Sequence, residues 1–242
     1  MKTFFSQLES RIREIDSLLC VGLDPHRSDL AELPKARKAS GAAALEFCLG
    51  LIEATADVAA AYKPNSAFFE SLGPEGLAAL QQVIAAIPDE IPVILDAKRG
   101  DIASTARAYA QAAFQTLGAD AITINPYLGR DAVEPFTADP EKGVFLLCKT
   151  SNPGAADLQD LLLTPTLTPN PSPTGRGESD SPLPPGEGLG VREIVRERVR
   201  ERVRPEPLYI HLARLAQTWN VSDNLGLVVG ATQPESLARV RS

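Results

Sequence analysis

The stretch Leu95-Asp96-Ala97-Lys98-Arg99-Gly100-Asp101-Ile102 is the part of this chain that decides its fold. It follows an apolar run over residues 91–95, which predicts a buried strand. Because side chains alternate between the two faces of a strand, Asp96 and Lys98 point to the same side. A buried charge is costly unless it is paired, so packing alone does not explain charged residues at this position.

The residues that follow extend this charged group. Gly100 breaks the strand, and Asp101 stands where the next helix is expected to begin. Two carboxylates and an ammonium are therefore expected to converge at the carboxyl end of one strand. The group is either a structural ion pair that caps the following helix or part of a functional site.

Outward from this stretch, short apolar runs alternate with helical patterns. Strands are predicted over residues 18–23, 59–62, 91–95, 121–124, 144–148 and 225–229, and helices over 42–58, 74–87, 102–117 and 208–219. Apolar strands separated by helices predict a parallel sheet covered on both faces. Repeated βα units leave a (β/α)8 barrel or an open doubly wound sheet, and no G-x-G-x-x-G follows the first strand to favour a dinucleotide-binding version of the latter.

Polar side chains stand at the carboxyl ends of five of the predicted strands. They are Asp24, Lys63, the group Asp96, Lys98 and Asp101, then Asn125, and finally residues 149–152. A barrel builds its active site from the loops at these ends. The repetition favours one shared site over a series of unrelated solvated loops.

Length and composition narrow the possible functions. The 242 residues, 44% of them hydrophobic, suit one α/β domain of barrel size or two small domains. A net charge of -7 argues against a nucleic-acid surface but allows a small anionic ligand. Residues 1–17 are too charged for a signal peptide and predict an amphipathic helix. No apolar run is long enough to span a membrane, so no membrane partner is expected.

The cysteines indicate a reducing compartment. Cys20, Cys48 and Cys148 are odd in number and widely spaced, and no C-x-x-C occurs, so neither a disulfide framework nor a zinc site is predicted. We expect buried free thiols and a cytoplasmic location.

One segment, residues 163–205, departs from the βα pattern. Residues 164–190 are dense in Pro, Gly, Ser and Thr, and residues 191–204 repeat a Val-Arg-Glu-Arg theme that could form an exposed, charged helix. We interpret the segment as a low-complexity insertion in a surface loop of one domain that spans residues 1–242. A tether for a partner is the alternative.

Several motifs together resemble the orotidine 5'-phosphate decarboxylase family, in its bacterial branch with a DAKRGDI strand. They are Val21-Gly22-Leu23-Asp24-Pro25, Tyr62-Lys63-Pro64-Asn65, Asp96 to Ile102 with Thr105, Asn125-Pro126-Tyr127-Leu128-Gly129, Cys148-Lys149-Thr150-Ser151-Asn152-Pro153-Gly154 and Val228-Val229-Gly230-Ala231-Thr232. They occur in the family's order over nearly the whole chain outside the 163–205 segment. Each motif alone is a moderate signal, whereas the set in register is strong.

The resemblance implies a (β/α)8 TIM barrel that works as a homodimer with shared active sites. It also implies conversion of orotidine 5'-phosphate to UMP and CO2 in pyrimidine biosynthesis, without a metal or an organic cofactor. On this resemblance Lys98 is the proton donor to C6 of the pyrimidine, and Asp96 faces the substrate carboxylate. Lys63 completes the charged network and holds the ribose together with Asp24, and Ser151 contacts the pyrimidine. Asp101, Ile102 and Thr105 are the residues that the family supplies to the neighbouring subunit's site.

The chain also departs from the family pattern. It ends at Ser242, shortly after the strand that we count as the sixth of eight, so the family's glycine-rich phosphate loop and final arginine-bearing strand are not seen. We therefore expect about six of the eight βα units and a weak hold on the substrate. Two other functions stay open: a magnesium-dependent sugar-phosphate decarboxylase or aldolase of the same superfamily, and a non-catalytic remnant.

Overall fold

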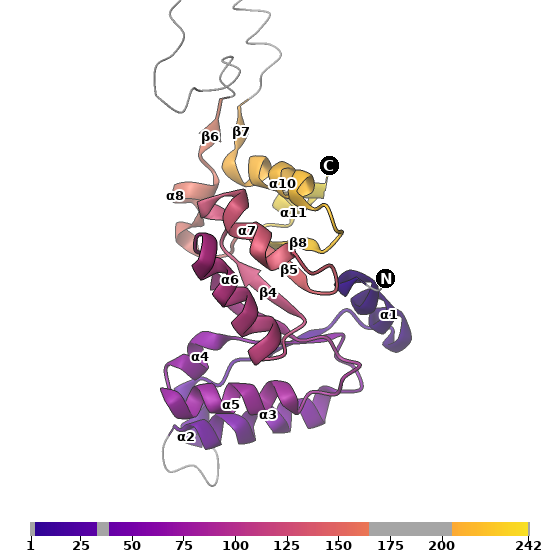
Figure 1. The fold of residues 1–242 in the computed structure, drawn as a ribbon, viewed down its shortest axis with the longest axis vertical. Helices are drawn as coiled ribbons and strands as arrows, with labels where there is room; N and C mark the ends of the chain where they lie inside the picture. Colours follow the sequence, from indigo (N-terminus) through magenta and orange to yellow (C-terminus); the bar gives the residue numbers. More distant parts are fainter. Residues whose placement is uncertain (1–2, 33–38, 165–204, 242) are drawn as a thin grey trace, which may run out of the picture.

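The computed structural model describes residues 3–32, 39–164 and 205–241 (Figure 1). Most of the 163–205 segment, including the expected helix over residues 191–204, lies outside these ranges. Across the described residues, no helix is both long and apolar enough to cross a bilayer.

Six parallel strands form the centre of the described structure. They are β1 (Cys20–Leu23), β2 (Ala61–Pro64), β3 (Ile94–Arg99), β4 (Ala121–Ile124), β5 (Gly143–Lys149) and β8 (Leu225–Val229). β1 pairs with β2, and β3, β4, β5 and β8 pair in that order. Two isolated parallel bridges, Tyr62 to Val93 and Asn65 to Asp96, connect β2 to β3. Within the described ranges no pairing joins β1 to β8, so the sheet follows the strand order of a barrel but stays open.

Helices precede, connect and follow these strands. They are α1 (Phe4–Ile15), α2 (Arg27–Glu32), α3 (Gly41–Thr55), α4 (Ser66–Glu70), α5 (Pro74–Ala85), α6 (Ala103–Gln111), η1 (Ala112–Thr116), η2 (Pro126–Leu128), α7 (Arg130–Thr137), η3 (Pro153–Ala155), α8 (Ala156–Gln159), α10 (Leu208–Trp219) and α11 (Pro234–Arg241). α3 packs beside α5 and α6 beside α7 (Figure 1). Their buried faces form one apolar core with the strands. The incomplete (β/α)8 barrel that the sequence predicts is confirmed.

The amino end of the sheet is covered by α1, the expected amphipathic helix. The rings of Phe4, Phe5 and Phe145 meet edge to face, with centroids 5.2–5.9 Å apart. Phe4 lies directly over Gly143, where a Cβ atom would stand 2.3 Å from its ring. The buried guanidinium of Arg11 donates hydrogen bonds to the backbone carbonyls of residues 56 and 59. This contact ties α1 to the end of α3.

The structure corrects the expected boundaries around the charged stretch. β3 does not end at Leu95 but continues to Arg99, so Asp96 and Lys98 lie inside the strand. α6 begins at Ala103 with Ile102 as its N-cap, so Asp101 does not cap it. The single helix predicted over residues 102–117 is wrong in its last part, which is the π-helical turn η1.

Two short strands frame the 163–205 segment. β6 (Leu162–Leu163) and β7 (Glu206–Pro207) pair antiparallel, with Leu163 opposite Glu206. α10 begins directly after β7 and packs on β5 and β8. The chain therefore leaves the fold and returns to it at adjacent positions.

Candidate active site

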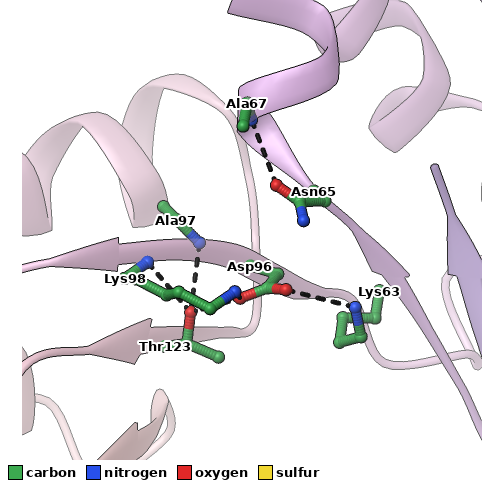
Figure 2. Close-up of polar contacts among 7 residues, drawn as sticks. All are labelled: Lys63, Asn65, Ala67, Asp96, Ala97, Lys98 and Thr123. Carbon is green, nitrogen blue, oxygen red and sulfur yellow. Dashed lines mark hydrogen bonds and ion pairs between the residues drawn. The ribbon is translucent and has the colours of Figure 1, made fainter. Parts of the chain in front are cut away.

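Lys63 of β2 and Lys98 of β3 meet on the carboxylate of Asp96, whose residue is only 7% exposed. The Nζ atom of Lys98 lies 2.6 Å from Oδ1 of Asp96, and the Nζ atom of Lys63 lies 3.2 Å from Oδ2 (Figure 2). Both lysine side chains remain partly open, at 33% for Lys63 and 49% for Lys98. The arrangement is a buried anion held between two ammonium groups that solvent, or a ligand, can reach.

A bulge in β3 places these groups. The register between β3 and β4 shifts between Leu95 and Arg99, and Lys98 adopts a left-handed φ of 48°. The hydroxyl of Thr123 on β4 accepts hydrogen bonds from the backbone N–H groups of Ala97 and Lys98, at 3.1 and 3.0 Å. The same hydroxyl donates to Oδ1 of Asp96 at 2.7 Å (Figure 2).

Thr123 is the site residue that the sequence analysis missed. It lies within the apolar run over residues 121–124 and is 4% exposed. A buried polar side chain needs a partner. The signal was therefore one hydroxyl inside an otherwise apolar strand.

The surroundings of Asp96 favour its ionised form. Burial by itself raises the pKa of this carboxyl. Hydrogen bonds from Lys98 and Thr123, together with the positive charges of Lys63 and Lys98, outweigh burial and hold the pKa below its ordinary value. The site thus keeps a negative charge fixed between two positive ones.

The loops after β2 and β4 each begin with an asparagine whose side chain binds the backbone two residues later. The side-chain oxygen of Asn65 accepts from the N–H of Ala67, and that of Asn125 accepts from the N–H of Tyr127. Gly100 passes close to Asn125, where a Cβ atom would stand 3.0 Å from its backbone oxygen. The two hydrogen bonds shape the loops after β2 and β4, and the approach of Gly100 to Asn125 brings the loops after β3 and β4 together at the carboxyl ends of the strands.

Asp24 follows β1 and carries a polar atom without a hydrogen-bond partner. Its Oδ1 atom is buried and makes no hydrogen bond within the described residues. The thiol of Cys48 lies within the field of this carboxylate. Burial first, and then the charge of Asp24, raise the pKa of Cys48 to about 12. An unpaired buried oxygen is costly, so the side chain of Asp24 is poised to accept a donor.

Ser151 is exposed and lies where the loop after β5 meets the end of β8. A Cβ atom at Gly230 would stand 3.0 Å from the Cβ atom of Ser151, and the N–H of Gly230 donates to the carbonyl of Lys149 at 2.7 Å. Thr150 exchanges hydrogen bonds with Gln159 at 2.8 and 2.9 Å. The loop that carries Ser151 is therefore fastened on both sides.

Lys149, the last residue of β5, is almost fully buried. Its Nζ atom lies 2.7 Å from Oδ1 of Asp160, and it stands 5.5 Å from the ring centre of Tyr209. Lys149 is one of the polar residues that the sequence places at the shared site, at the carboxyl end of a predicted strand. The structure instead gives it an internal ion pair.

Three predicted site residues make none of the hydrogen bonds or ion pairs of the Asp96 cluster within the described ranges. Ile102 and Thr105 are exposed, and Asp101 accepts a hydrogen bond from the N–H of Ile102. Within the described ranges no ion pair joins Asp101 to a lysine. The structure brings Lys63 to Asp96 and Lys98 as the third charge of the cluster, and the role of Asp101 stays a prediction.

The cysteines differ from one another. Cys48 and Cys148 are buried free thiols, as expected, whereas Cys20 is exposed. The expectation of burial is wrong for Cys20 because β1 forms the edge of the open sheet.

Comparison with known proteins gives consistent matches. The family model described as orotidine 5'-phosphate decarboxylase / HUMPS family matches residues 17–168. An orotidine 5'-phosphate decarboxylase of Herpetosiphon aurantiacus is 45% identical over 225 residues, which is 93% of this chain and 68% of that protein. One of Thermomicrobium roseum is 45% identical over 99% of this chain and 71% of its own length. The solved structure of the Leishmania donovani OMP decarboxylase is 46% identical, with a TM-score of 0.73 over 99% of this chain and 75% of that one.

Proposed function

Because the chain belongs to the orotidine 5'-phosphate decarboxylase / HUMPS family, we propose that it converts orotidine 5'-phosphate to UMP and CO2. The observation that carries the proposal is the contact of Lys63 and Lys98 with the buried carboxylate of Asp96 at the carboxyl ends of β2 and β3. Fixed charges of alternating sign suit a reaction in which negative charge moves from a carboxylate to a ring carbon.

Lys98 acts on the carbon that loses CO2. Cleavage of the bond between C6 and the carboxylate leaves the electron pair on C6 of the pyrimidine. The partly exposed ammonium of Lys98 stabilises that developing charge and then transfers a proton to C6. CO2 leaves, so the atoms and the charge balance without an oxidant or a metal.

Asp96 faces the substrate carboxylate in this proposal. Its lowered pKa keeps it charged at neutral pH, so two carboxylates stand near each other in the bound complex. Their repulsion is relieved when CO2 departs. Binding energy from the remote phosphate would offset the repulsion in the ground state.

Asp24, Lys63 and Ser151 hold the rest of the substrate. Asp24 has an unpaired carboxylate oxygen, and a ribose hydroxyl is a donor that could satisfy it after a rotation of the side chain. Lys63 is partly open and can reach a second ribose hydroxyl. Ser151 is exposed at the end of β5 and offers its hydroxyl to the pyrimidine.

A homodimer with shared sites would explain the residues outside the cluster. Ile102, Tyr127 and Leu128 are 57%, 77% and 45% exposed, although all three are apolar and follow β3 or β4. Asp101 and Thr105 lie next to this apolar group in the chain. We propose that a second copy covers these side chains and receives Asp101, Ile102 and Thr105 at its own site.

The ligand of the site is a small phosphorylated nucleotide rather than a nucleic acid, and no cofactor takes part in the reaction. The free, buried thiols of Cys48 and Cys148 support a reducing, cytoplasmic location. Residues 1–242 are one barrel domain, and residues 163–205 are a segment inserted within it.

Turnover of orotidine 5'-phosphate by the purified chain tests the function. Loss of the substrate absorbance and appearance of UMP are expected, with equal rates in EDTA and in added Mg²⁺. A rate that requires Mg²⁺, or turnover of a sugar phosphate instead, would assign the chain to the magnesium-dependent decarboxylases or aldolases. A folded protein without turnover of either substrate would be a non-catalytic relative.

A further inference from the structure

We propose that Thr123 is a positioning residue, whose single hydroxyl fixes both the carboxylate of Asp96 and the backbone of Lys98. Thr123 has no contact with the substrate in the proposed function. It acts instead through Asp96 and Lys98, which do contact the substrate there. Its effect on turnover rests on the proposed function, whereas its effect on Asp96 does not.

The hydrogen bonds of Thr123 use the full capacity of its hydroxyl. A threonine hydroxyl can donate once and accept twice. Here it donates to Oδ1 of Asp96 at 2.7 Å and accepts from the N–H groups of Ala97 and Lys98 at 3.1 and 3.0 Å. Because Thr123 is 4% exposed, water is a poor substitute for any of these partners.

The bulge in β3 explains why a side chain is needed at this point. Leu95 still pairs with Ile122 of β4, and Arg99 pairs with Ile124, so Ala97 and Lys98 fall outside the regular register. Their N–H groups are bound by the Thr123 side chain in place of a strand carbonyl. Lys98 can then hold a left-handed φ of 48°, which an L residue seldom adopts unless its surroundings require it.

The same hydroxyl sets the orientation of the Asp96 carboxylate. Oδ1 accepts hydrogen bonds from the Thr123 hydroxyl and from the Nζ atom of Lys98. Oδ2 is left facing Lys63 of β2. The thiol of Cys20 on β1 also lies within the electrostatic field of Asp96 and Lys63. The hydroxyl of Thr123 carries no charge, so removing it alters geometry and hydrogen bonding without altering the net charge of the cluster.

The test compares Thr123→Val with Thr123→Ser. Valine keeps the shape of the side chain and loses the hydroxyl, whereas serine keeps the hydroxyl. Thr55→Val is the matched control, because the Thr55 hydroxyl also makes internal hydrogen bonds, to the carbonyl of Leu51 and the hydroxyl of Tyr62, away from Asp96. The readouts are the carboxyl titration of Asp96 by carbon-13 NMR and, separately, kcat and KM for orotidine 5'-phosphate.

We expect the pKa of Asp96 to rise in Thr123→Val, and to stay at the parental value in Thr123→Ser and Thr55→Val. Turnover by Thr123→Val should fall on the order of tenfold to a hundredfold in kcat, with a smaller change in KM, because the reacting groups are misplaced. An unchanged pKa of Asp96 in a folded Thr123→Val protein would overturn the proposal. If the parent protein does not turn over orotidine 5'-phosphate, the proposed function is wrong. The titration of Asp96 still tests the positioning role of Thr123 in that case.

A second measurement needs no substitution and covers the case in which Thr123→Val fails to fold. In the parent protein the amide protons of Ala97 and Lys98 should be protected from hydrogen exchange, as are those in the β3–β4 ladder. Exchange of both amides at the rate of an unstructured chain would show that the Thr123 hydroxyl does not hold them, and would also overturn the proposal.

Discussion

The Nζ atom of Lys98 lies 2.6 Å from Oδ1 of Asp96, two residues earlier in the same strand. In a regular strand the two residues would stand about 7 Å apart along one face. The bulge in β3 lies between Leu95 and Arg99, and Lys98 takes its left-handed φ within it. The pair is therefore formed locally within β3, whereas Lys63 reaches the same carboxylate from another strand.

Replacement of Lys98 by alanine should abolish turnover and leave the fold intact. The side chain is 49% exposed, so little packing is lost, while the ammonium beside the reacting carbon is removed. Assays of orotidine 5'-phosphate consumption and thermal unfolding measure the two effects. Lys142→Ala is the matched control, since Lys142 pairs with Asp120 at the opposite, amino end of the sheet. Parental turnover by Lys98→Ala would refute its role as proton donor.

The stabilising effect of Asp96 should depend on pH in a defined direction. Its pKa is lowered in the folded protein from the ordinary 3.8, so its contribution is fully present above that value. The contribution is lost as the pH falls through the lower, folded pKa. Denaturant unfolding of the parent and of Asp96→Asn should therefore differ at pH 7 and converge in strong acid. The exposed Asp57→Asn serves as control, and a difference that grows on acidification would contradict the prediction.

The ion pair of Lys149 should be much more sensitive to loss of one charge than to loss of both. Asp160→Asn leaves a buried ammonium without its carboxylate and should cost about 2 kcal/mol of unfolding free energy, less than a fully buried pair because Asp160 is 43% exposed. Lys149→Met combined with Asp160→Asn keeps the aliphatic volume and should recover most of that loss. Denaturant melts of the single and double variants measure it, and equal losses in both would argue against the prediction.

The contact of Phe4 with Gly143 should make that glycine intolerant of a side chain. Gly143→Ala places a Cβ atom 2.3 Å from the Phe4 ring and should destabilise the protein by about 1–3 kcal/mol. Gly50→Ala is the control, because Gly50 lies in α3 with open space around it and the same change should stabilise by up to about 1 kcal/mol. Thermal unfolding of both variants provides the comparison. Similar changes in melting temperature would show that the Phe4 ring can move aside at little cost.

Residues 164–205 should be removable without loss of the fold. Leu163 and Glu206 are already paired across the short β6–β7 ladder, and an Asn-Gly turn is the usual two-residue connection for such a pair. The shortened protein should keep its melting temperature to within a few degrees and keep its turnover. A flexible four-residue Gly-Ser linker is the control for the turn itself. Failure of both connections to yield a folded protein would contradict the proposed insertion.

Much of the fold could be predicted because its signals are local. The pattern over residues 208–219 coincides with α10, and Gly73-Pro74 marks the start of α5. The apolar runs located each of the six parallel strands to within a few residues. Periodicity and turn chemistry report such features directly.

The parts that could not be predicted depend on contacts between distant residues. β3 reaches Arg99 through the bulge, and the N–H groups within the bulge bind Thr123, which is far away in sequence. The buried Lys149 contacts Asp160, just after α8, and Tyr209 of α10, both later in the chain. A strand pattern shows that a charge needs a partner, but not which residue the fold will bring to it.

The Lys63–Asp96 ion pair crosses the junction between the two-stranded and four-stranded parts of the sheet. Among the described residues, the backbone connections across this junction are the two isolated bridges at Tyr62 and Asn65 and the hydrogen bond that the N–H of Tyr62 donates to the carbonyl of Pro92. A brief separation of β2 from β3 would pull the two charges apart while both halves keep their own ladders. We therefore expect local opening at this junction, rather than global unfolding, to be what separates Lys63 from Asp96.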